Sequence, residues 1–338
     1  MHIKSLNLKN FTVFTDFYLD VDSGVNIFVG ENGTGKTHLL KALYAACESG
    51  KSENPVDELL KCFKENQKEA DLIRDRNSSQ LTISIFSEDV TRKIRYDQQC
   101  LNILNAPSFF EGKYSIEVPD GIKFSAVYIP VKDMLTHSNG FLAMANKYRD
   151  FPFNKTLTDI IIKASQWKVK QPPKLALTIL PLFEEMMDGA VVFENDEFYI
   201  KKRSGRLIKF ELEAEGLKKI GLLWQLLMTD NLTENSILIW DEPEANLNPK
   251  FLPQIVECLL ELSRHGVQIF LSTHNYIFAK YFNVRAKDSD SLTFHSLYMQ
   301  NGDVRVESDK IFSSLKNNAI MQTFDRLLEE VYNLDMGD

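Results

Sequence analysis

Residues 25–37 decide the fold of this chain, and they read VNIFVGENGTGKT. A short apolar strand, Val25 to Val29, leads into a glycine-rich turn, and a helix that carries Leu39, Leu40 and Leu43 follows. The turn matches the pattern G-x-x-x-x-G-K-[ST] in the strand–loop–helix setting that this pattern requires. A chance glycine turn is the alternative, and the flanking strand and helix argue against it. The stretch therefore predicts a loop that binds a nucleoside triphosphate.

The spacing within this loop follows from the chemistry of phosphate binding. Glycines let the backbone curl so that several N–H groups point at phosphate oxygens, and the next helix presents its positive end to the same anion. We expect Lys36 to reach the β and γ phosphates and the hydroxyl of Thr37 to bind Mg²⁺. The residues expected to contact the nucleotide here are Gly30, Asn32, Gly33, Thr34, Gly35, Lys36, Thr37 and His38.

Composition narrows the class of protein. A chain of 338 residues provides one large domain or two modest ones, and its apolar and charged fractions are ordinary for a globular protein. It contains no run of 18 or more apolar residues and no apolar secretory signal, so no membrane association is expected. The cysteines at positions 47, 62, 100 and 258 form no C-x-x-C pair. We therefore expect reduced thiols, no zinc site and a cytoplasmic location.

The charge is acidic overall, with one basic cluster. A net charge of −8 argues against tight autonomous DNA binding, although it does not exclude a local patch. The basic cluster, which is interleaved with aromatic residues, comprises Lys201, Lys202, Arg203, Arg206 and Lys209. A solvated hairpin tip is the favoured interpretation of this cluster, and a nucleic-acid contact is the alternative.

Hydrophobic periodicity divides the first part of the chain. Residues 1–9 alternate as strands do, and apolar residues continue from Phe11 to Leu19, so a β-hairpin or sheet edge is expected before the loop. The segment from Asn54 to Arg76 keeps helical spacing and predicts one long helix or two. Three further strands are expected at Leu81–Phe86, Arg92–Tyr96 and Tyr114–Val118.

A mainly helical region follows the strand Ser125–Pro130 and lasts until Gly189. We expect prolines to break it into short helices, at Pro152, Pro172, Pro173 and Pro181. A hairpin with strands Val191–Ile200 and Leu207–Leu212 comes next, with residues 201–206 as its turn. No heptad pattern is sustained over several repeats, which excludes a long coiled coil.

The second half predicts alternating helices and strands. Helices are expected at Leu217–Met228 and Pro253–Leu262, and strands at Val267–Leu271, Leu292–Met299 and Val304–Glu307. The last predicted element is a helix over Ala319–Leu334, whose apolar residues we expect to face inward for packing: Met321, Phe324, Leu327, Leu328 and Val331.

Residues 236–243 read SILIWDEP, an apolar run that ends in two acidic residues. A strand of this kind places its acids at the carboxyl end, where open α/β sheets bind their ligands. We expect Asp241 to hold Mg²⁺, directly or through water, and Glu242 to orient or deprotonate the attacking water. Any buried strand can end in an acidic turn, so it is the pairing with the phosphate loop that indicates hydrolysis.

His274 directly follows the next apolar strand, within Ser272-Thr273-His274. A histidine at that end of a strand, beside the acidic pair, can reach a γ-phosphate. A capping or core histidine is the alternative, and the position beside the acids favours the functional interpretation.

These motifs together resemble the ABC-type ATPase heads of the RecF and structural-maintenance-of-chromosomes (SMC) branch. The resemblance lies in the phosphate loop, in DEPE at 241–244, in NLNP at 246–249 and in STH at 272–274. The opening strand, IKSLNLKNF at 3–11, is similar to that of the same branch. More narrowly, the chain looks like the compact "AAA family" ATPases found beside nucleases in bacterial anti-phage systems of the Septu- or retron-associated type.

The resemblance implies an α/β fold: a P-loop NTPase head of the ABC/SMC type with a mixed central sheet, an N-terminal antiparallel β-subdomain and a helical lid subdomain. It implies a single head over residues 1–338. The core lobe would take about 1–50 and 210–310, the β/helical insert about 51–209, and the packing helix about 319–334.

It also implies roles for individual residues. Asn246 would open the D-loop, His274 would be the switch histidine, and Gly216 would lie in the signature segment that caps the ATP of a partner copy. This segment departs from the family pattern, because Ala214 replaces a serine and Glu215 follows it. Slow turnover is therefore expected, with Glu215 turned toward Lys218, Lys219 or a neighbouring protomer. No glutamine follows Ser125–Pro130 to form a Q-loop, and Lys132 or Asp133 are the candidate substitutes.

The expected function is therefore that of an ATPase that uses ATP and Mg²⁺ and closes as a head-to-tail homodimer or higher oligomer. It would regulate a partner effector such as a nuclease in antiviral defence. One alternative is an ATP-gated assembly scaffold with negligible hydrolysis. Another is a RecF-like repair ATPase that binds DNA through a partner or through the basic hairpin.

Overall fold

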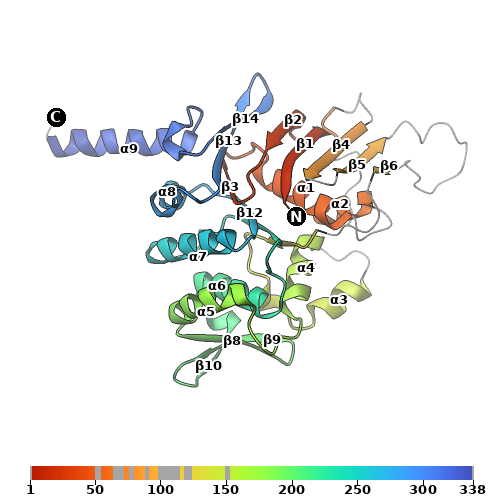
Figure 1. The fold of residues 1–338 in the computed structure, drawn as a ribbon, viewed down its shortest axis with the longest axis vertical. Coiled ribbons are helices and arrows are strands. Elements are labelled where there is room, and N and C mark those ends of the chain that lie inside the picture. The colour runs from red at the N-terminus through yellow and green to blue at the C-terminus, as the bar shows by residue number, and fades with distance from the viewer. Residues whose placement is uncertain are drawn as a thin grey trace, which may run out of the picture.

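A computed structural model gives the fold of the chain (Figure 1). The residues that the structure describes are 2–49, 55–63, 72–75, 80–87, 91–97, 115–117, 124–148 and 153–336. A central sheet lies in the middle of the molecule, an antiparallel sheet lies beside it, and helices with a small third sheet lie at the far end. None of the helices in these ranges is long and apolar enough to cross a membrane.

The central sheet has six strands in the order β14-β13-β3-β12-β11-β7. Their bounds are Val25–Gly30 (β3), Ala126–Ile129 (β7), Ile237–Asp241 (β11), Gln268–Ser272 (β12), Leu292–Gln300 (β13) and Asp303–Asp309 (β14). All neighbouring pairs are parallel except β13 and β14, so the sheet is mixed, as predicted. Each of β3, β7, β11 and β12 is buried along its whole length, as expected for parallel strands covered on both faces.

A second sheet is antiparallel, in the order β2-β1-β4-β5-β6, and confirms the predicted N-terminal β-subdomain. Its strands are Ile3–Phe11 (β1), Phe14–Asp20 (β2), Gln80–Ser87 (β4), Thr91–Asp97 (β5) and Ser115–Glu117 (β6). Helix α1, Lys36–Glu48, shares one hydrophobic core with this sheet. The phosphate loop is thus held between two sheets.

The segment after β3 and α1 is only partly helical, which corrects one prediction. Helix α2 spans Pro55–Phe63, whereas Ile73 forms an isolated β-bridge with Phe11. The predicted helix over Asn54–Arg76 therefore does not reach its end, and residues 64–71 lie outside the described part. The backbone at Thr12 and Arg74 instead pairs across the two segments, which favours extended chain there.

The helical region contains α3 (Phe141–Lys147), α4 (Lys155–Ala164) and α5 (Lys174–Met187). The predicted break at Pro181 is wrong, because α5 continues through it. Proline removes the hydrogen bond to the carbonyl four residues earlier, that of Leu177. Leu177 is 60% exposed, so water can hydrate this carbonyl and the helix can run on.

The predicted hairpin after this region is a three-stranded sheet. It consists of β8 (Gly189–Glu194), β9 (Glu197–Lys202) and β10 (Leu207–Lys209). Sequence reasoning missed the tight turn at Asn195 and Asp196, both of which have positive φ, and so it joined β8 and β9 into one strand. It also extended β10 to Leu212, where the chain forms a short 3₁₀ helix instead.

Helices α6 (Glu215–Met228), α7 (Leu252–Arg264) and α8 (Tyr276–Arg285) complete the body. The last helix, α9 (Ala319–Met336), projects from it (Figure 1). The helix itself was predicted, but its inward packing is correct only for Met321 and Phe324. Leu327 and Leu328 are each 51% exposed, and Val331 is 45% exposed. Only its first turns contact the body, through Ile320, Met321 and a stacked pair of rings, Phe324 and Tyr276.

Candidate functional site

The phosphate loop joins β3 to α1 through a backbone that only glycine accepts at two positions. Gly30 and Gly35 have φ of 141° and 88°. A Cβ atom on Gly30 would lie 2.1 Å from the carbonyl oxygen of Leu297, and one on Gly35 would lie 2.5 Å from Cγ2 of Val13. Both the conformation and the close packing therefore require glycine.

Inside the loop, Lys36 and Thr34 hold the turn in shape. The ammonium of Lys36 donates to the carbonyls of Gly30 and Glu31, each over 2.8 Å, and the hydroxyl of Thr34 donates to Glu31 over 2.8 Å. Burial lowers the pKa of Lys36 to about 8. Glu31 and Asn32 at the tip are exposed, so the loop offers backbone to a ligand from outside.

Asp241 is the meeting point of three elements. Its carboxylate accepts hydrogen bonds from the hydroxyls of Thr37 on α1 (2.9 Å), Ser272 on β12 and Tyr128 on β7 (3.4 Å). The parallel register pairs Asp241 with Ser272, which brings the ends of β11 and β12 together. Asp241 is only 3% exposed. A carboxylate beside a hydroxyl is the oxygen donor set that Mg²⁺ prefers.

Glu242 and His274 face each other next to this junction. The distance from Nε2 of His274 to Oε1 of Glu242 is 3.6 Å, and both side chains are about one third exposed. Burial lowers the pKa of His274, and the nearby positive charge of Lys36 adds to the shift. Glu242 has a φ of 49°, an uncommon conformation for a residue with a side chain, and such strain clusters at functional sites.

A second layer of polar residues supports this pair, and sequence reasoning assigned it no role. The carboxylate of Glu244 accepts from the hydroxyl of Thr273 (2.6 Å) and from the backbone N–H of His274 (3.2 Å). Burial raises the pKa of Glu244. Lys219 on α6 donates to the carbonyl of Glu242 over 3.0 Å. Ser272 could have been found from the expectation that adjacent strands end at the same edge of the sheet, whereas no local pattern marks Lys219.

The predicted signature residue Gly216 has the D-loop segment as its nearest neighbour outside α6. A Cβ on it would lie 2.8 Å from Cδ1 of Leu247 and 3.3 Å from the carbonyl oxygen of Asn246. Gly216 and Asn246 therefore pack against each other. Glu215 turns to Lys218, with 2.7 Å between Oε1 and Nζ, in agreement with one of its expected directions.

Two other predicted site residues have structural partners. Asp133, a candidate Q-loop substitute, accepts from the backbone N–H of Leu135 over 3.0 Å and lies 3.8 Å from Nζ of Lys218. The ring of His38 packs edge-on against Phe63 at 5.4 Å. Burial lowers the pKa of His38.

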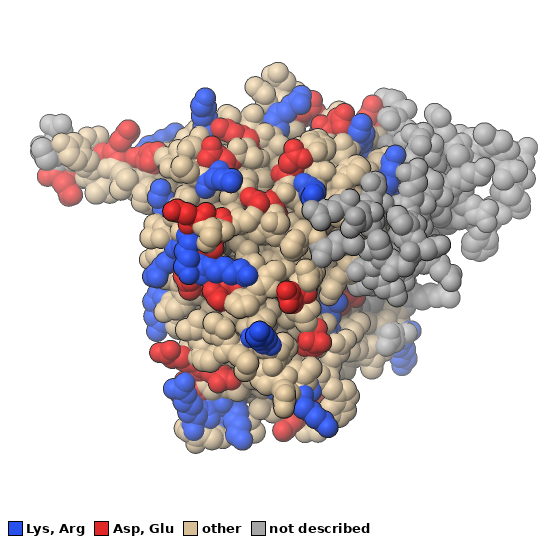
Figure 2. Space-filling model, viewed as in Figure 1, with Lys and Arg blue, Asp and Glu red and all other residues tan. Residues whose placement is uncertain are grey.

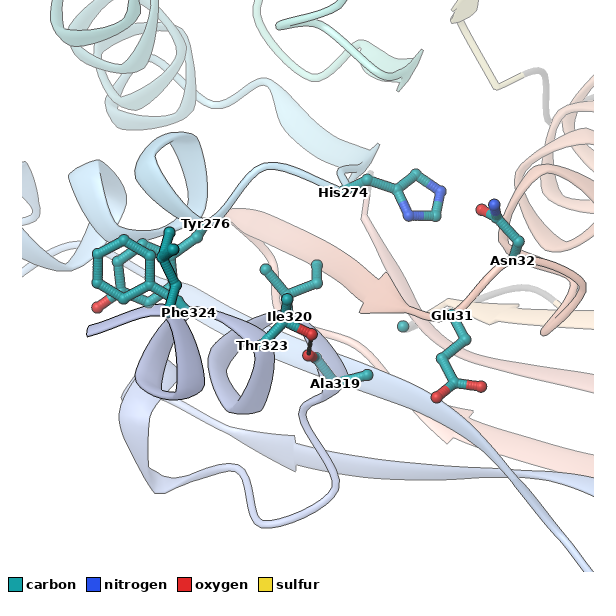
Figure 3. Close-up of a pocket in the computed structure, with 10 residues that line it drawn as sticks. Glu31, Asn32, His274, Tyr276, Ala319, Ile320, Thr323 and Phe324 are labelled. Carbon is teal, nitrogen blue, oxygen red and sulfur yellow. Dashed lines mark hydrogen bonds between the residues drawn. The ribbon is translucent and has the colours of Figure 1, made fainter. Parts of the chain in front are cut away.

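A cavity of about 420 Å³ opens beside the loop, and α9 forms one of its walls (Figure 3). The lining residues from the site are Gly30, Glu31, Asn32 and His274, and those from α8 and α9 include Tyr276, Ile320, Phe324 and Leu327. In Figure 3 the ring of His274 points toward Asn32. The contribution of α9 was not predicted, because the sequence of a helix does not tell which distant loop it lies against.

A phosphate loop beside an acidic strand end, on a mixed sheet, defines a P-loop ATPase with an ABC/SMC-like head. The chain belongs to the family described as "AAA ATPase domain", which its residues 1–171 match. Residues 119–279 match a second family, described as "AAA domain, putative AbiEii toxin, Type IV TA system". The predicted ATPase class is confirmed at this level.

Known proteins of the RecF and SMC type are similar to this chain. The DNA replication and repair protein RecF of Clostridium kluyveri is 26% identical over 250 residues, which are 70% of this chain and 65% of that protein. The chain therefore spans less than two thirds of the length of this relative.

Two solved structures show the fold. A crystal structure of the SmcHead bound to the C-winged helix domain of ScpA has a TM-score of 0.59 at 15% identity, covering 94% of this chain and 100% of that one. An Smc head domain with an extended coiled coil, bound to the C-terminal domain of ScpA derived from Pyrococcus furiosus, has a TM-score of 0.54 at 13% identity, covering 98% and 99%. The predicted ABC/SMC-like fold is confirmed.

Proposed function

We propose that two copies of this ATPase close head-to-tail on ATP and Mg²⁺, and that closure and hydrolysis regulate a partner effector. The observation that carries the proposal is the hydrogen bond from Thr37 to Asp241, which joins motifs 204 residues apart into one oxygen-rich site. The neighbouring pair of Glu242 and His274 supplies groups suited to hydrolysis at the same place.

The residues of the loop fit ATP and Mg²⁺. Lys36 and the loop backbone would bind the β and γ phosphates, with Asn32, Gly33, Thr34 and His38 at the loop and helix start. Thr37 and Asp241 would hold Mg²⁺, whose charge would offset that of the phosphates. Glu242 would orient or deprotonate the attacking water, and His274 would contact the γ-phosphate.

The placement of Gly216 and Asn246 supports a head-to-tail dimer. They pack against each other and are not among the residues that line the cavity at the phosphate loop. In the proposed dimer they would contact the nucleotide of a second copy, to whose γ-phosphate α6 would present its N-terminal end.

The effector would be a nuclease in anti-phage defence, of the kind implied by the resemblance to Septu- and retron-associated ATPases. A RecF-like DNA-binding repair ATPase is the second candidate, favoured by the match to RecF over 70% of the chain. A cytoplasmic location is part of the same proposal.

An ATP-gated scaffold with negligible hydrolysis is the third candidate, since Ala214 lacks the serine hydroxyl of the family motif. The arrangement at Glu215 bears on it directly: its carboxylate pairs with Lys218, so its charge need not repel ATP. The hydrolysing ATPase is favoured because Glu242 and His274 are both in place.

The proposal is tested by steady-state phosphate release from the parent protein, Glu242→Gln and Lys36→Ala, with Glu234→Gln as the matched control on the exposed loop before β11. We expect Glu242→Gln to bind ATP but release phosphate at least tenfold more slowly, and Lys36→Ala to lose binding. Equal and slow release by the parent and Glu242→Gln, with ATP-dependent assembly in both, would establish the scaffold instead.

A further inference from the structure

Helix α9 carries an apolar stripe that is exposed to solvent along most of its length. Its residues follow one another at alternating spacings of four and three, as in the seam between two packed helices: Ile320, Phe324, Leu327, Val331 and Leu334. The first three pack on the body or line the cavity beside the phosphate loop. Leu334 is 79% exposed, and Tyr332 beside the stripe is 63% exposed. The stripe therefore begins at the nucleotide site and continues into solvent.

The rim of this stripe is acidic. Arg326 is the one basic residue on the described helix, whereas the acidic residues are Asp325, Glu329, Glu330 and Asp335, all exposed. Figure 2 shows acidic side chains along the projecting helix. Two such helices paired with each other would bring like charges together, which opposes association. The charge instead favours an occupant that is basic and apolar.

The basic cluster between β9 and β10 has these properties. Lys201, Arg203 and Arg206 are exposed there, and Leu207 beside them is 49% exposed. Leu212, three residues after β10, is 78% exposed. Lysines and arginines gather at this end of the molecule, below α5 and α6 (Figures 1 and 2).

The basic turn is also tied to the signature segment. Lys202 forms an ion pair with Glu213 at 2.6 Å, and Glu213 lies three residues before Gly216. The ion pair places the basic turn beside the signature segment, so a second copy that contacts Gly216 would lie close to the turn as well. Because α9 and the turn lie at opposite ends of one copy, they do not meet within it (Figure 1). A head-to-tail arrangement brings opposite ends of two copies together.

We propose that the acidic, apolar face of α9 in one copy docks against the basic β9–β10 turn and Leu212 of a second copy. This inference rests on the proposed head-to-tail closure and deepens it. It gives a role to the basic cluster, which has no part in the proposed nucleotide site. It also gives a role to the stripe of α9, most of which is exposed in a single copy. Nucleotide binding and docking are linked because the first turns of α9 form a wall of the cavity at Asn32 and His274.

A charge-reversal experiment tests the docking. Glu329→Lys with Glu330→Lys reverses α9, and Lys201→Glu with Arg203→Glu reverses the turn. Dimer dissociation constants are measured by sedimentation velocity with ATP and Mg²⁺, in the Glu242→Gln background. We expect each reversed pair to weaken the dimer at least tenfold and the combination of all four to restore it to within about threefold. Glu185→Lys, on the exposed side of α5, is the control and should leave the constant unchanged.

The outcomes separate the inference from the function on which it rests. If the Glu242→Gln parent binds ATP but remains monomeric, the proposed closure fails and the docking fails with it. If that parent dimerises while the reversals have no effect, or if the four changes together do not restore the dimer, only the docking is overturned. If Lys201→Glu with Arg203→Glu abolishes salt-sensitive binding of duplex DNA and leaves the dimer intact, the cluster belongs to DNA and the docking is again overturned.

Discussion

The ammonium group of Lys219, on α6, donates a hydrogen bond to the backbone carbonyl of Glu242 over 3.0 Å. Lys219 lies three residues after Gly216, and burial lowers its pKa to about 8. The contact therefore joins the helix proposed to cap the nucleotide of a second copy to the residue proposed to act on the nucleotide of its own. A displacement of α6 can therefore move the backbone of Glu242 directly, and a displacement of Glu242 can move α6.

We expect Lys219→Met to lower the turnover number for ATP at least fivefold while the dissociation constant for ATP changes less than twofold. Methionine fills the space of the lysine stem, but it leaves the Glu242 carbonyl with only the backbone N–H of Ala245 as a donor. The strained backbone that aims the carboxylate therefore loses a constraint. Single-turnover phosphate release and equilibrium binding separate the two effects. Lys287→Met, on an exposed loop, is the matched control, and an unchanged turnover number in Lys219→Met would contradict the prediction.

Ser272 is expected to set the affinity for Mg²⁺. Its hydroxyl donates to Oδ1 of Asp241 and leaves Oδ2 to Thr37 and Tyr128. Removing a hydrogen bond that orients a metal ligand costs about tenfold or more in metal affinity. Ser272→Ala should thus raise the Mg²⁺ concentration for half-maximal phosphate release about tenfold. Ser296→Ala, which removes a buried hydroxyl from β13 instead, should leave it unchanged, and equal shifts in both variants would refute the assignment.

His295 is expected to make the fold sensitive to acid. It is fully buried, its Nε2 donates to Oδ1 of Asn26 over 3.2 Å, and its Nδ1 accepts from the hydroxyl of Ser308 over 2.8 Å. This arrangement suits the neutral ring, and burial lowers the pKa to about 3. Because the unfolded chain takes up the proton near pH 6.5, stability is present above that pH and is lost as the pH falls toward 3.

Between pH 7 and pH 5 this one group should lower the free energy of unfolding by about 2 kcal/mol. Urea denaturation at both pH values measures the loss. His295→Gln should show a smaller loss over the same interval, although it is less stable at pH 7. The exposed His137→Gln should behave as the parent does, and an equal acid effect in His295→Gln and the parent would exclude His295 as the cause.

The sequence predicted the part of the site that local chemistry dictates. The glycines at 30 and 35, Lys36 and Thr37 follow from the geometry of phosphate binding, and the acids at 241 and 242 follow from where a buried strand must end. The structure brings the lysine, the threonine, both acids and His274 to one edge of the sheet. The roles assigned to them stay predictions until nucleotide binding and turnover are measured.

What the sequence did not predict depends on contacts between distant segments. Lys219 and Tyr128 reach the site from α6 and β7, and nothing in their local patterns distinguishes them from other helix and strand residues. The stripe of α9 has the periodicity of a packed helix, and periodicity reports that a face is apolar without saying what covers it. The turn at Asn195 and Asp196 was missed because the apolar residues on both sides were interpreted as one continuous strand.

Pro181 offers a test of how α5 tolerates a proline. Pro181→Ala should stabilise the fold by about 1–3 kcal/mol, because alanine restores a helical hydrogen bond to Leu177 and has the higher helix propensity. Thermal and urea unfolding measure the gain. Pro173→Ala, at the N-cap of the same helix, is the control and should give no gain, since a proline there costs no helical hydrogen bond. A destabilised Pro181→Ala would mean that the helix depends on a kink at this position.

The exposed part of α9 should contribute little to the free energy of unfolding of a single copy. Val331→Ala and Leu334→Ala should each change the free energy of unfolding by less than about 0.5 kcal/mol without nucleotide, because surface substitutions remove little packing. Phe324→Ala should cost about 1–2 kcal/mol, since its ring stacks on Tyr276 at 3.9 Å. Urea denaturation at low protein concentration keeps the copies apart. A loss above 1 kcal/mol in Leu334→Ala would mean that this end of the helix is packed in one copy, and the stripe would then have no free face to offer a second.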